Sequence, residues 1–175
     1  MPRSALLIID MINPFDFPGG AQLARAATAL APTIARLKSR MRSRGFPCIY
    51  ANDNFGKWQS DLAALLERAR AGRGGAVVDA LHPDDRDYFV IKPRHSAFYQ
   101  TNLQFLLEEL EVRRLVLAGL AAESCVLLTA LDAHMRGFKV HAPSDCTAGS
   151  TAARKAAALT VLRSSDIDTA RLAVA

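Results

Sequence analysis

Cysteine is scarce in this chain of 175 residues, which contains only Cys48, Cys125 and Cys146. The number is odd, the spacing is wide and no C-x-x-C pair occurs, so the pattern excludes a disulfide framework. The N-terminus has neither the charged region nor the short apolar region of a secretory signal. We therefore expect a reduced, cytoplasmic setting.

Long apolar runs are also missing, although 50% of the residues are hydrophobic. The longest runs, such as Ala5 to Ile9 and Leu115 to Leu120, are far shorter than the ~18 residues of a membrane span, so we expect no membrane partner. No G-x-G-x-x-G follows the first run, and no G-x-x-x-x-G-K-[ST] occurs anywhere. Their absence argues against a Rossmann-type cofactor protein, and we expect no cofactor.

Acidic residues are outnumbered, with 17 Asp and Glu against 22 Lys and Arg, which gives a formal net charge of +5. The densest basic group, from Arg36 to Arg44, has no aromatic residues among its members. A nucleic-acid platform would need aromatics that stack on bases, so we interpret the group as a solvated helix face and expect no nucleic-acid partner. An anionic substrate attracted by the basic surface stays open.

Short apolar runs alternate along the chain with longer stretches of helical periodicity. The runs that predict strands are residues 5–10, 47–53, 88–92, 114–120, 139–143 and, weakly, 166–170. Short runs of almost continuous apolarity are typical of a parallel sheet covered on both faces. We predict a single α/β domain over residues 1–175, a Rossmann-like three-layer α/β/α fold with a mostly parallel six-stranded sheet.

Chemically active residues follow several of these runs. The first strand ends in Asp10, the third ends in Lys92, and the fourth leads to Cys125. Ligands bind beyond the carboxyl ends of parallel strands, so the three should share one edge of the sheet. Each has an ordinary alternative: Asp10 as a turn residue, Lys92 as an exposed strand end, and Cys125 as an inert core thiol. Their joint placement favours a site, because a carboxylate and an ammonium are buried at lower cost as a pair.

The predicted position of Cys125, in the first turn of a helix, gives a reason for reactivity. Lowering a thiol pKa by about two requires roughly 2.7 kcal/mol of thiolate stabilisation. A helix N-terminus supplies at most about 2 kcal/mol, and Lys92 would supply the remainder. We therefore expect an activated Cys125.

Four segments carry a resemblance to a known family: LLIIDMINPFDFPGG, YANDNFGKW, VIKPRHSAF and GLAAESCVLLTALDAHMRGFKV. In order and spacing they resemble the isochorismatase-like cysteine hydrolases, over about residues 4 to 165. The resemblance implies a catalytic triad of Asp10, Lys92 and Cys125, with Asp10 as the proton shuttle. It also implies an oxyanion hole of the Ala121 and Cys125 N–H groups, a cis peptide bond at Leu120–Ala121, and a homo-oligomer of two or more subunits.

Two departures from the family pattern affect the functional prediction. Ala122 and Glu123 stand where the family usually has threonine followed by asparagine or aspartate, and Glu123 would either raise the thiol pKa or point to solvent. The nicotinamidase branch has a metal site of an aspartate and histidines after the second strand, but residues 51–58 contain no histidine. The four histidines, His82, His95, His134 and His141, are dispersed. We therefore predict no metal and consider nicotinamide unsuitable as a substrate.

Aromatic residues beyond the strand ends are candidates for the walls of a substrate pocket. They are Phe15, Phe17, Phe55, Trp58 and Phe98. Aromatics at such spacing are more often core residues. Phe15 and Phe98 are the strongest candidates because their motifs flank Asp10 and Lys92, and Phe55 and Trp58 are further ones.

The leading hypothesis is a cysteine-dependent hydrolase of a small amide or carbamoyl compound, acting through a thioester. The vinyl ether chemistry of true isochorismatases is a weaker alternative, because that branch is expected to do without the thiol. A catalytically silent family member that binds a small metabolite or a protein partner is a further alternative, motivated by Ala122 and Glu123.

Overall fold

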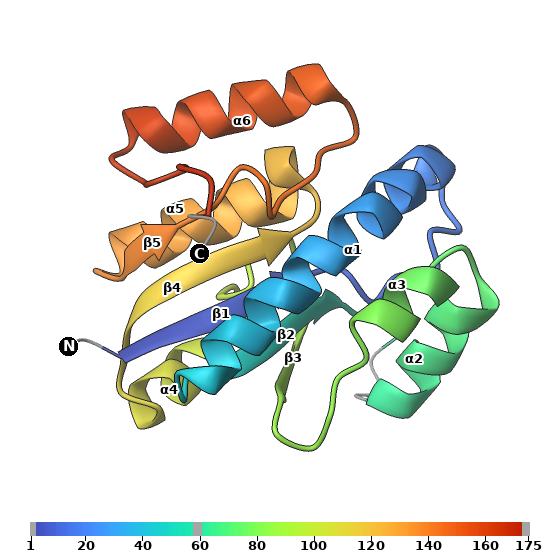
Figure 1. Cartoon of the computed structure of the whole chain (residues 1–175), viewed down its shortest axis with the longest axis horizontal. Coiled ribbons are helices and arrows are strands. Elements are labelled where there is room, and N and C mark those ends of the chain that lie inside the picture. The colour runs from blue at the N-terminus through green and yellow to red at the C-terminus, as the bar shows by residue number, and fades with distance from the viewer. Residues whose placement is uncertain (1–2, 58–60, 173–175) are drawn as a thin grey trace.

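The fold is built around one parallel sheet, seen in a computed structural model that describes residues 3–57 and 61–172 (Figure 1). The strands are β1 (Arg3–Ile9), β2 (Cys48–Asp53), β3 (Tyr88–Lys92), β4 (Val112–Gly119) and β5 (Lys139–His141). They lie in the order β3-β2-β1-β4-β5, and every neighbouring pair is parallel. The two central strands, β1 and β4, are apolar and buried over most of their length, as expected for a sheet covered on both faces.

The prediction of six strands is wrong by one strand. Residues 166–170 form only an isolated bridge, between His141 and Asp168, rather than a paired strand. β5, the edge strand beside them, is just three residues long, and Asp166 has a left-handed φ of 58° directly after the last helix. The segment therefore runs past the sheet edge with little backbone available for pairing.

Helices cover both faces of the sheet, so the three-layer α/β/α prediction is confirmed. They are α1 (Gly20–Ser43), α2 (Leu62–Ala71), α3 (Gly75–Ala80), α4 (Leu103–Glu109), η1 (Ala122–Val126), α5 (Leu127–Met135) and α6 (Ala152–Ser164). The short η1 has the wider π-helical turn and leads directly into α5. No helix within the described residues is both long and apolar enough to cross a membrane.

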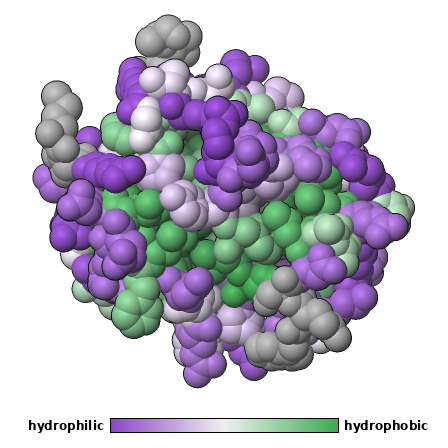
Figure 2. Space-filling view, turned by 90° about the horizontal axis from the view of Figure 1, so that it is seen from below, coloured by the Kyte–Doolittle hydropathy of each residue, from purple (hydrophilic) through white to green (hydrophobic). Residues whose placement is uncertain are grey.

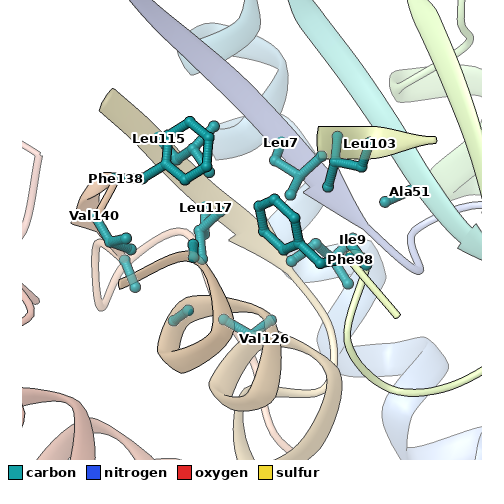
Figure 3. Close-up of a cluster of buried hydrophobic side chains, with 14 of the residues drawn as sticks. Leu7, Ile9, Ala51, Phe98, Leu103, Leu115, Leu117, Val126, Phe138 and Val140 are labelled. Atoms are coloured by element: carbon teal, nitrogen blue, oxygen red, sulfur yellow. The ribbon is translucent and has the colours of Figure 1, made fainter. Parts of the chain in front are cut away.

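Alternation along the strands divides the core into two clusters. Leu6 and Ile8 point to the face covered by α1 and α3, whereas Leu7 and Ile9 point to the face covered by α4 and α5. The second of these clusters is drawn in Figure 3, where Phe98 lies among side chains from the sheet. In the space-filling view from below, apolar side chains gather in a central area framed by hydrophilic ones (Figure 2). Because both faces are covered, the carboxyl ends of the strands are left to form a site.

Candidate active site

Asp10 occupies the first position after β1 and is held by the neighbouring strand. Its backbone has a left-handed φ of 52°, and its N–H donates to the carbonyl of Ala51 at 3.0 Å. One carboxylate oxygen, Oδ1, accepts a hydrogen bond from the N–H of Asp53 at 2.8 Å. These two bonds turn the buried carboxylate toward the end of β3.

Lys92 is the last residue of β3 and is completely buried. Its Nζ lies 2.9 Å from Asp10 Oδ2 and 3.4 Å from the Sγ of Cys125. Nζ also donates to the carbonyl of Arg94 at 3.3 Å, and the Asp53 carboxylate lies 3.9 Å away. A buried ammonium needs a partner, and Lys92 has an ion pair, a thiol and a carbonyl around it. Lys92 thus brings Asp10 and Cys125 together at one edge of the sheet, as expected from their positions after the strands.

Cys125 lies within η1, immediately beyond the end of β4. The turn is closed by a hydrogen bond from the Val126 N–H to the Ala121 carbonyl at 3.2 Å. Gly119, which ends β4, has a φ of 117°, and a Cβ at this position would lie 2.1 Å from the carbonyl oxygen of Ile9. Glycine is therefore required where the chain leaves the sheet. This close approach brings the turn that contains Cys125 against β1 and so near Asp10.

The electrostatics of the thiol differ from the expectation of an activated thiolate. Burial and, next in size, the charge of Asp10 raise the pKa of Cys125 to about 12, against the opposing effect of Lys92. Burial also raises the pKa of Asp10, whereas Lys92 opposes that shift. Burial alone would lower the pKa of Lys92, but the charges of Asp10 and Cys125 raise it. The resting site therefore holds a protonated thiol beside an ammonium.

The side chain of Glu123 takes neither of the two orientations expected from the sequence, toward the thiol of Cys125 or toward solvent. Its carboxylate accepts hydrogen bonds from the N–H of Ser150 at 2.9 Å and from the Ser150 hydroxyl. The carboxylate is thus directed to the segment before α6. Nearby, the N–H of Ala122 donates to the carbonyl of Ala148 at 2.9 Å. The nucleophile's turn is joined to residues 148–150 by both bonds.

The expected cis peptide bond is not found. The described residues contain no cis peptide bond, so Leu120–Ala121 is trans. The trans form is lower in energy for a non-proline residue, and the Leu120 N–H is bonded to the carbonyl of Ile9 at 2.9 Å. The Ala121 N–H has no hydrogen-bond partner within the described part of the chain.

A pocket of about 260 Å³ lies beside the ends of β2 and β3, and Asp10, Lys92 and Cys125 do not line it. Asp53, Phe55 and Ile91 line it near the strand ends, and Arg68 from α2 lines its outer wall. The guanidinium carbon of Arg68 lies 5.7 Å from the centre of the Phe55 ring. Phe55 is therefore the aromatic residue beside the site, whereas Trp58 lies outside the described residues.

Phe15 and Phe98, the strongest sequence candidates for pocket walls, belong to the core instead. Phe15 is fully buried in the cluster beneath α1. Phe98 packs 5.8 Å from the Phe138 ring, centre to centre, in the opposite cluster (Figure 3). Their motifs flank Asp10 and Lys92, but neither side chain lines the pocket beside Asp53.

His95 is a member of the site that the sequence analysis did not select. Its Nδ1 lies 3.6 Å from Cys125 Sγ, and the residue is exposed. The motif VIKPRHSAF placed it three residues after Lys92, but nothing in that spacing indicates that the loop folds back over the thiol. Across residues 3–57 and 61–172, no three His, Cys, Asp or Glu side chains are grouped as metal ligands would be.

Comparison with known proteins identifies the family. Residues 4–171 match the isochorismatase domain. The chain belongs to the isochorismatase family. This confirms the resemblance drawn from the four sequence segments.

Relatives within the isochorismatase family cover most of the chain. YaaI, an uncharacterized isochorismatase family protein of Bacillus subtilis (strain 168), is 42% identical over 158 residues, which are 90% of this chain and 87% of YaaI. N-carbamoylsarcosine amidase of Arthrobacter sp is 27% identical over 155 residues, 82% of this chain and 58% of the amidase. The crystal structure of an isochorismatase family protein from Desulfovibrio vulgaris has a TM-score of 0.81 at 26% identity, covering 98% of this chain and 95% of that one. The isochorismatase family consists of hydrolases, including amidases that act on C–N bonds.

Proposed function

We propose that the protein is a cysteine-dependent hydrolase of a small amide or carbamoyl compound. The observation that carries the proposal is the position of the buried Lys92 Nζ, 2.9 Å from Asp10 and 3.4 Å from the thiol of Cys125. The ion pair with Asp10 alone would compensate for the burial of the Lys92 ammonium. The fold therefore does not require a thiol beside the same ammonium. The arrangement fits a nucleophile, a proton acceptor and a cation that stabilises both anions.

In the first half of the reaction, the sulfur of Cys125 attacks the carbonyl or carbamoyl carbon. The thiol proton passes to the carboxylate of Asp10 during attack, so a high resting thiol pKa is compatible with catalysis. Negative charge on the substrate oxygen is stabilised by the N–H groups of Ala121 and Cys125. The unpartnered N–H of Ala121 supports this role. The C–N bond then breaks, the departing nitrogen takes the proton from Asp10, and a thioester remains.

In the second half, water attacks the thioester carbon and Asp10 accepts a proton from it. The C–S bond breaks, and the sulfur of Cys125 recovers its proton from Asp10. Lys92 holds Asp10 in place and favours the anions that form at both neighbours. The products are ammonia or an amine and a carboxylic or carbamic acid.

The pocket beside Asp53 supports a small substrate. Its volume of about 260 Å³ is at the lower end of the range for ligand pockets. Phe55 and Ile91 offer apolar contact, and Asp53 offers a polar group within 3.9 Å of Lys92. The similarity to N-carbamoylsarcosine amidase supports carbamoyl compounds as a class to screen.

A panel of small amides and carbamoyl compounds, assayed for ammonia or amine release, tests the proposal. Mass spectrometry of the acid-quenched protein should show an adduct on the peptide that contains Cys125. Cys125→Ala should remove both turnover and adduct, whereas Cys146→Ala, a change at another buried thiol, should retain them. Turnover that survives in Cys125→Ala would refute the mechanism.

A metabolite-binding protein without activity is the second candidate. The raised pKa of Cys125 and its low exposure of 8% favour it, because both make the thiol unreactive at rest. Saturable binding of a panel compound without product would support it. A vinyl ether hydrolase would instead release no nitrogen and would survive loss of the thiol.

Assembly and location are part of the proposal. We propose that the protein is a homo-oligomer, and the exposure of the apolar side chains of Phe105 (71%) and Met135 (78%) is consistent with this. We also propose that it acts in the cytoplasm. Light scattering on the purified protein measures the number of subunits, and a monomer at micromolar concentration would contradict the assembly.

A further inference from the structure

The sulfur of Cys125 has different neighbours on its two sides. Lys92, fully buried, contacts it from within the fold at 3.4 Å. His95, exposed, contacts it through Nδ1 at 3.6 Å. A substrate cannot approach from the side of Lys92, so it must reach the sulfur on the side where His95 stands.

The helix that follows Cys125, α5, also fixes the loop that carries His95. The N–H of Ala97 donates to Thr129 Oγ1 at 3.0 Å, and the hydroxyl of Ser96 donates to the Asp132 carboxylate at 2.6 Å. Thr129 and Asp132 follow Cys125 by four and seven residues, the spacing of one helical face. The backbone directly after His95 is therefore fixed to α5 by two hydrogen bonds, which position the imidazole beside the sulfur.

An imidazole can perform proton transfers that the other neighbours of the sulfur cannot. Lys92, as an ammonium, only donates, and it remains charged beside Asp10. Asp10 holds one proton at a time, and both of its oxygens already accept hydrogen bonds, from Asp53 and Lys92. A neutral imidazole accepts a proton and an imidazolium donates one at ordinary pH.

We propose that His95 is a second acid–base residue of the site, serving the exposed side of Cys125 where the leaving nitrogen departs and water enters. The assignment rests on the amide hydrolysis proposed above and divides the proton transfers of Asp10 between two residues. The thiol proton goes to Asp10 and later returns to the sulfur. The imidazolium gives its proton to the departing nitrogen as the C–N bond breaks, and the imidazole regains one from the water that attacks the thioester.

The decisive experiment needs no substrate. Methyl methanethiosulfonate, a small neutral reagent, transfers its CH₃S group to thiolates, and the modification of Cys125 is followed by peptide mass against pH. An imidazolium beside the sulfur favours the thiolate, so the parent should react about tenfold faster than His95→Gln near pH 6, with the two rates converging above about pH 9.

Matched variants separate this effect from general changes in the protein. His134→Gln alters an exposed histidine on α5 and should follow the parent. His95→Asn serves as a second replacement, and thermal unfolding confirms that both are folded. The other ionisable groups around the pair are unchanged in these variants: Asp10 after β1, Asp53 on β2, Lys92 on β3, Arg94 in the loop and Asp132 on α5.

The outcomes distinguish this proposal from the proposed function. Superimposed pH–rate curves of the parent and His95→Gln overturn the role of His95, whether or not an amide is hydrolysed. A His95-dependent difference in a protein that hydrolyses no amide refutes only the amide hydrolase. Once a substrate is known, His95→Gln should lower kcat/KM by a factor of about 10². The pH profile of kcat/KM should also lose the part that falls with rising pH, because the imidazolium form of His95 donates the proton to the leaving nitrogen.

Discussion

Glu123 accepts a hydrogen bond from the N–H of Ser150 at 2.9 Å, and this bond joins the turn of the nucleophile to the start of α6. The Ser150 hydroxyl donates to the same carboxylate oxygen and accepts from Arg154 at 3.2 Å. Glu123, which departs from the family pattern, thus connects the turn that contains Cys125 to the segment before α6.

Removal of this carboxylate should destabilise the protein without altering the thiol directly. Glu123→Ala leaves the Ser150 N–H without its acceptor, so we expect a loss of about 1–3 kcal/mol in the free energy of unfolding by urea. Glu123→Gln retains an acceptor oxygen and should lose less. A Glu123→Ala protein as stable as the parent would show that the bond contributes nothing.

Removal of the Asp10 charge should make the thiol more reactive while turnover falls. The Asp10 carboxylate is one cause of the high pKa of Cys125, so Asp10→Asn should lower that pKa. Each decrease of about one in the thiol pKa raises the thiolate fraction roughly tenfold. Alkylation of Cys125 near pH 8 should therefore be about tenfold faster or more, although the variant lacks the proton acceptor.

Asp53→Asn is the matched control for that experiment. Its carboxylate lies 3.9 Å from Lys92 and is 39% exposed, so its removal should change the alkylation rate much less. Slower alkylation in Asp10→Asn than in the parent would contradict the assignment of Asp10 as the group that opposes ionisation of the thiol.

Replacement of Lys92 by methionine should cost stability in a manner that depends on pH. The variant leaves the Asp10 carboxylate buried and unpaired, a change that typically costs about 3–5 kcal/mol. Burial raises the pKa of Asp10 even in the parent, and loss of the ammonium raises it further. A carboxyl group with a folded pKa above its unfolded value favours the folded state while protonated, and this contribution is lost as the pH rises through the folded pKa.

The destabilisation of Lys92→Met, measured by urea unfolding, should therefore be smaller at acidic pH than at neutral pH. Adding Asp10→Asn should recover part of the loss, because the unpaired charge is then gone. An equal loss at both pH values would indicate that packing of the lysine stem, rather than the ion pair, determines the effect.

Two glycines allow a matched test of the close approach between the ends of β1 and β4. Gly119→Ala places a Cβ 2.1 Å from the Ile9 carbonyl oxygen, so we expect a loss of more than about 3 kcal/mol or failure to fold. Gly137 also has a positive φ, 85°, but nothing lies within 4 Å of a Cβ there. Gly137→Ala should cost only the backbone strain of about 1–3 kcal/mol. Equal stabilities would contradict the close approach.

The five strands and the polar residues that follow them could be predicted from the sequence, because buried parallel strands appear as uninterrupted apolar runs. A charged residue directly after such a run, as at Asp10 and Lys92, requires a partner, and the parallel arrangement provides it at the same edge. The weak run at 166–170 was misassigned because its pairing depends on the length of β5, which local apolarity does not determine. Phe98 packs in a core cluster, and its position near Lys92 in the sequence does not indicate this, because an aromatic beside a strand end can point to either side of the backbone.

Properties that arise from contacts distant in sequence could not be predicted. His95 reaches the thiol only because Thr129 and Asp132 hold its loop. The direction of the Cys125 pKa shift depends on burial and on Asp10, which outweigh the opposing effect of Lys92. The position of Glu123 depends on Ser150, 27 residues further along the chain.

The burial of Cys125 has a consequence for oxidative damage. Peroxides convert thiolates, and especially exposed ones, to sulfenic and then to irreversibly oxidised acids. Cys125 is 8% exposed and its pKa is raised by burial to about 12, so the resting protein offers little thiolate to such oxidants. In the proposed hydrolase, the same burial would therefore protect the sulfur of Cys125 from oxidation between encounters with substrate.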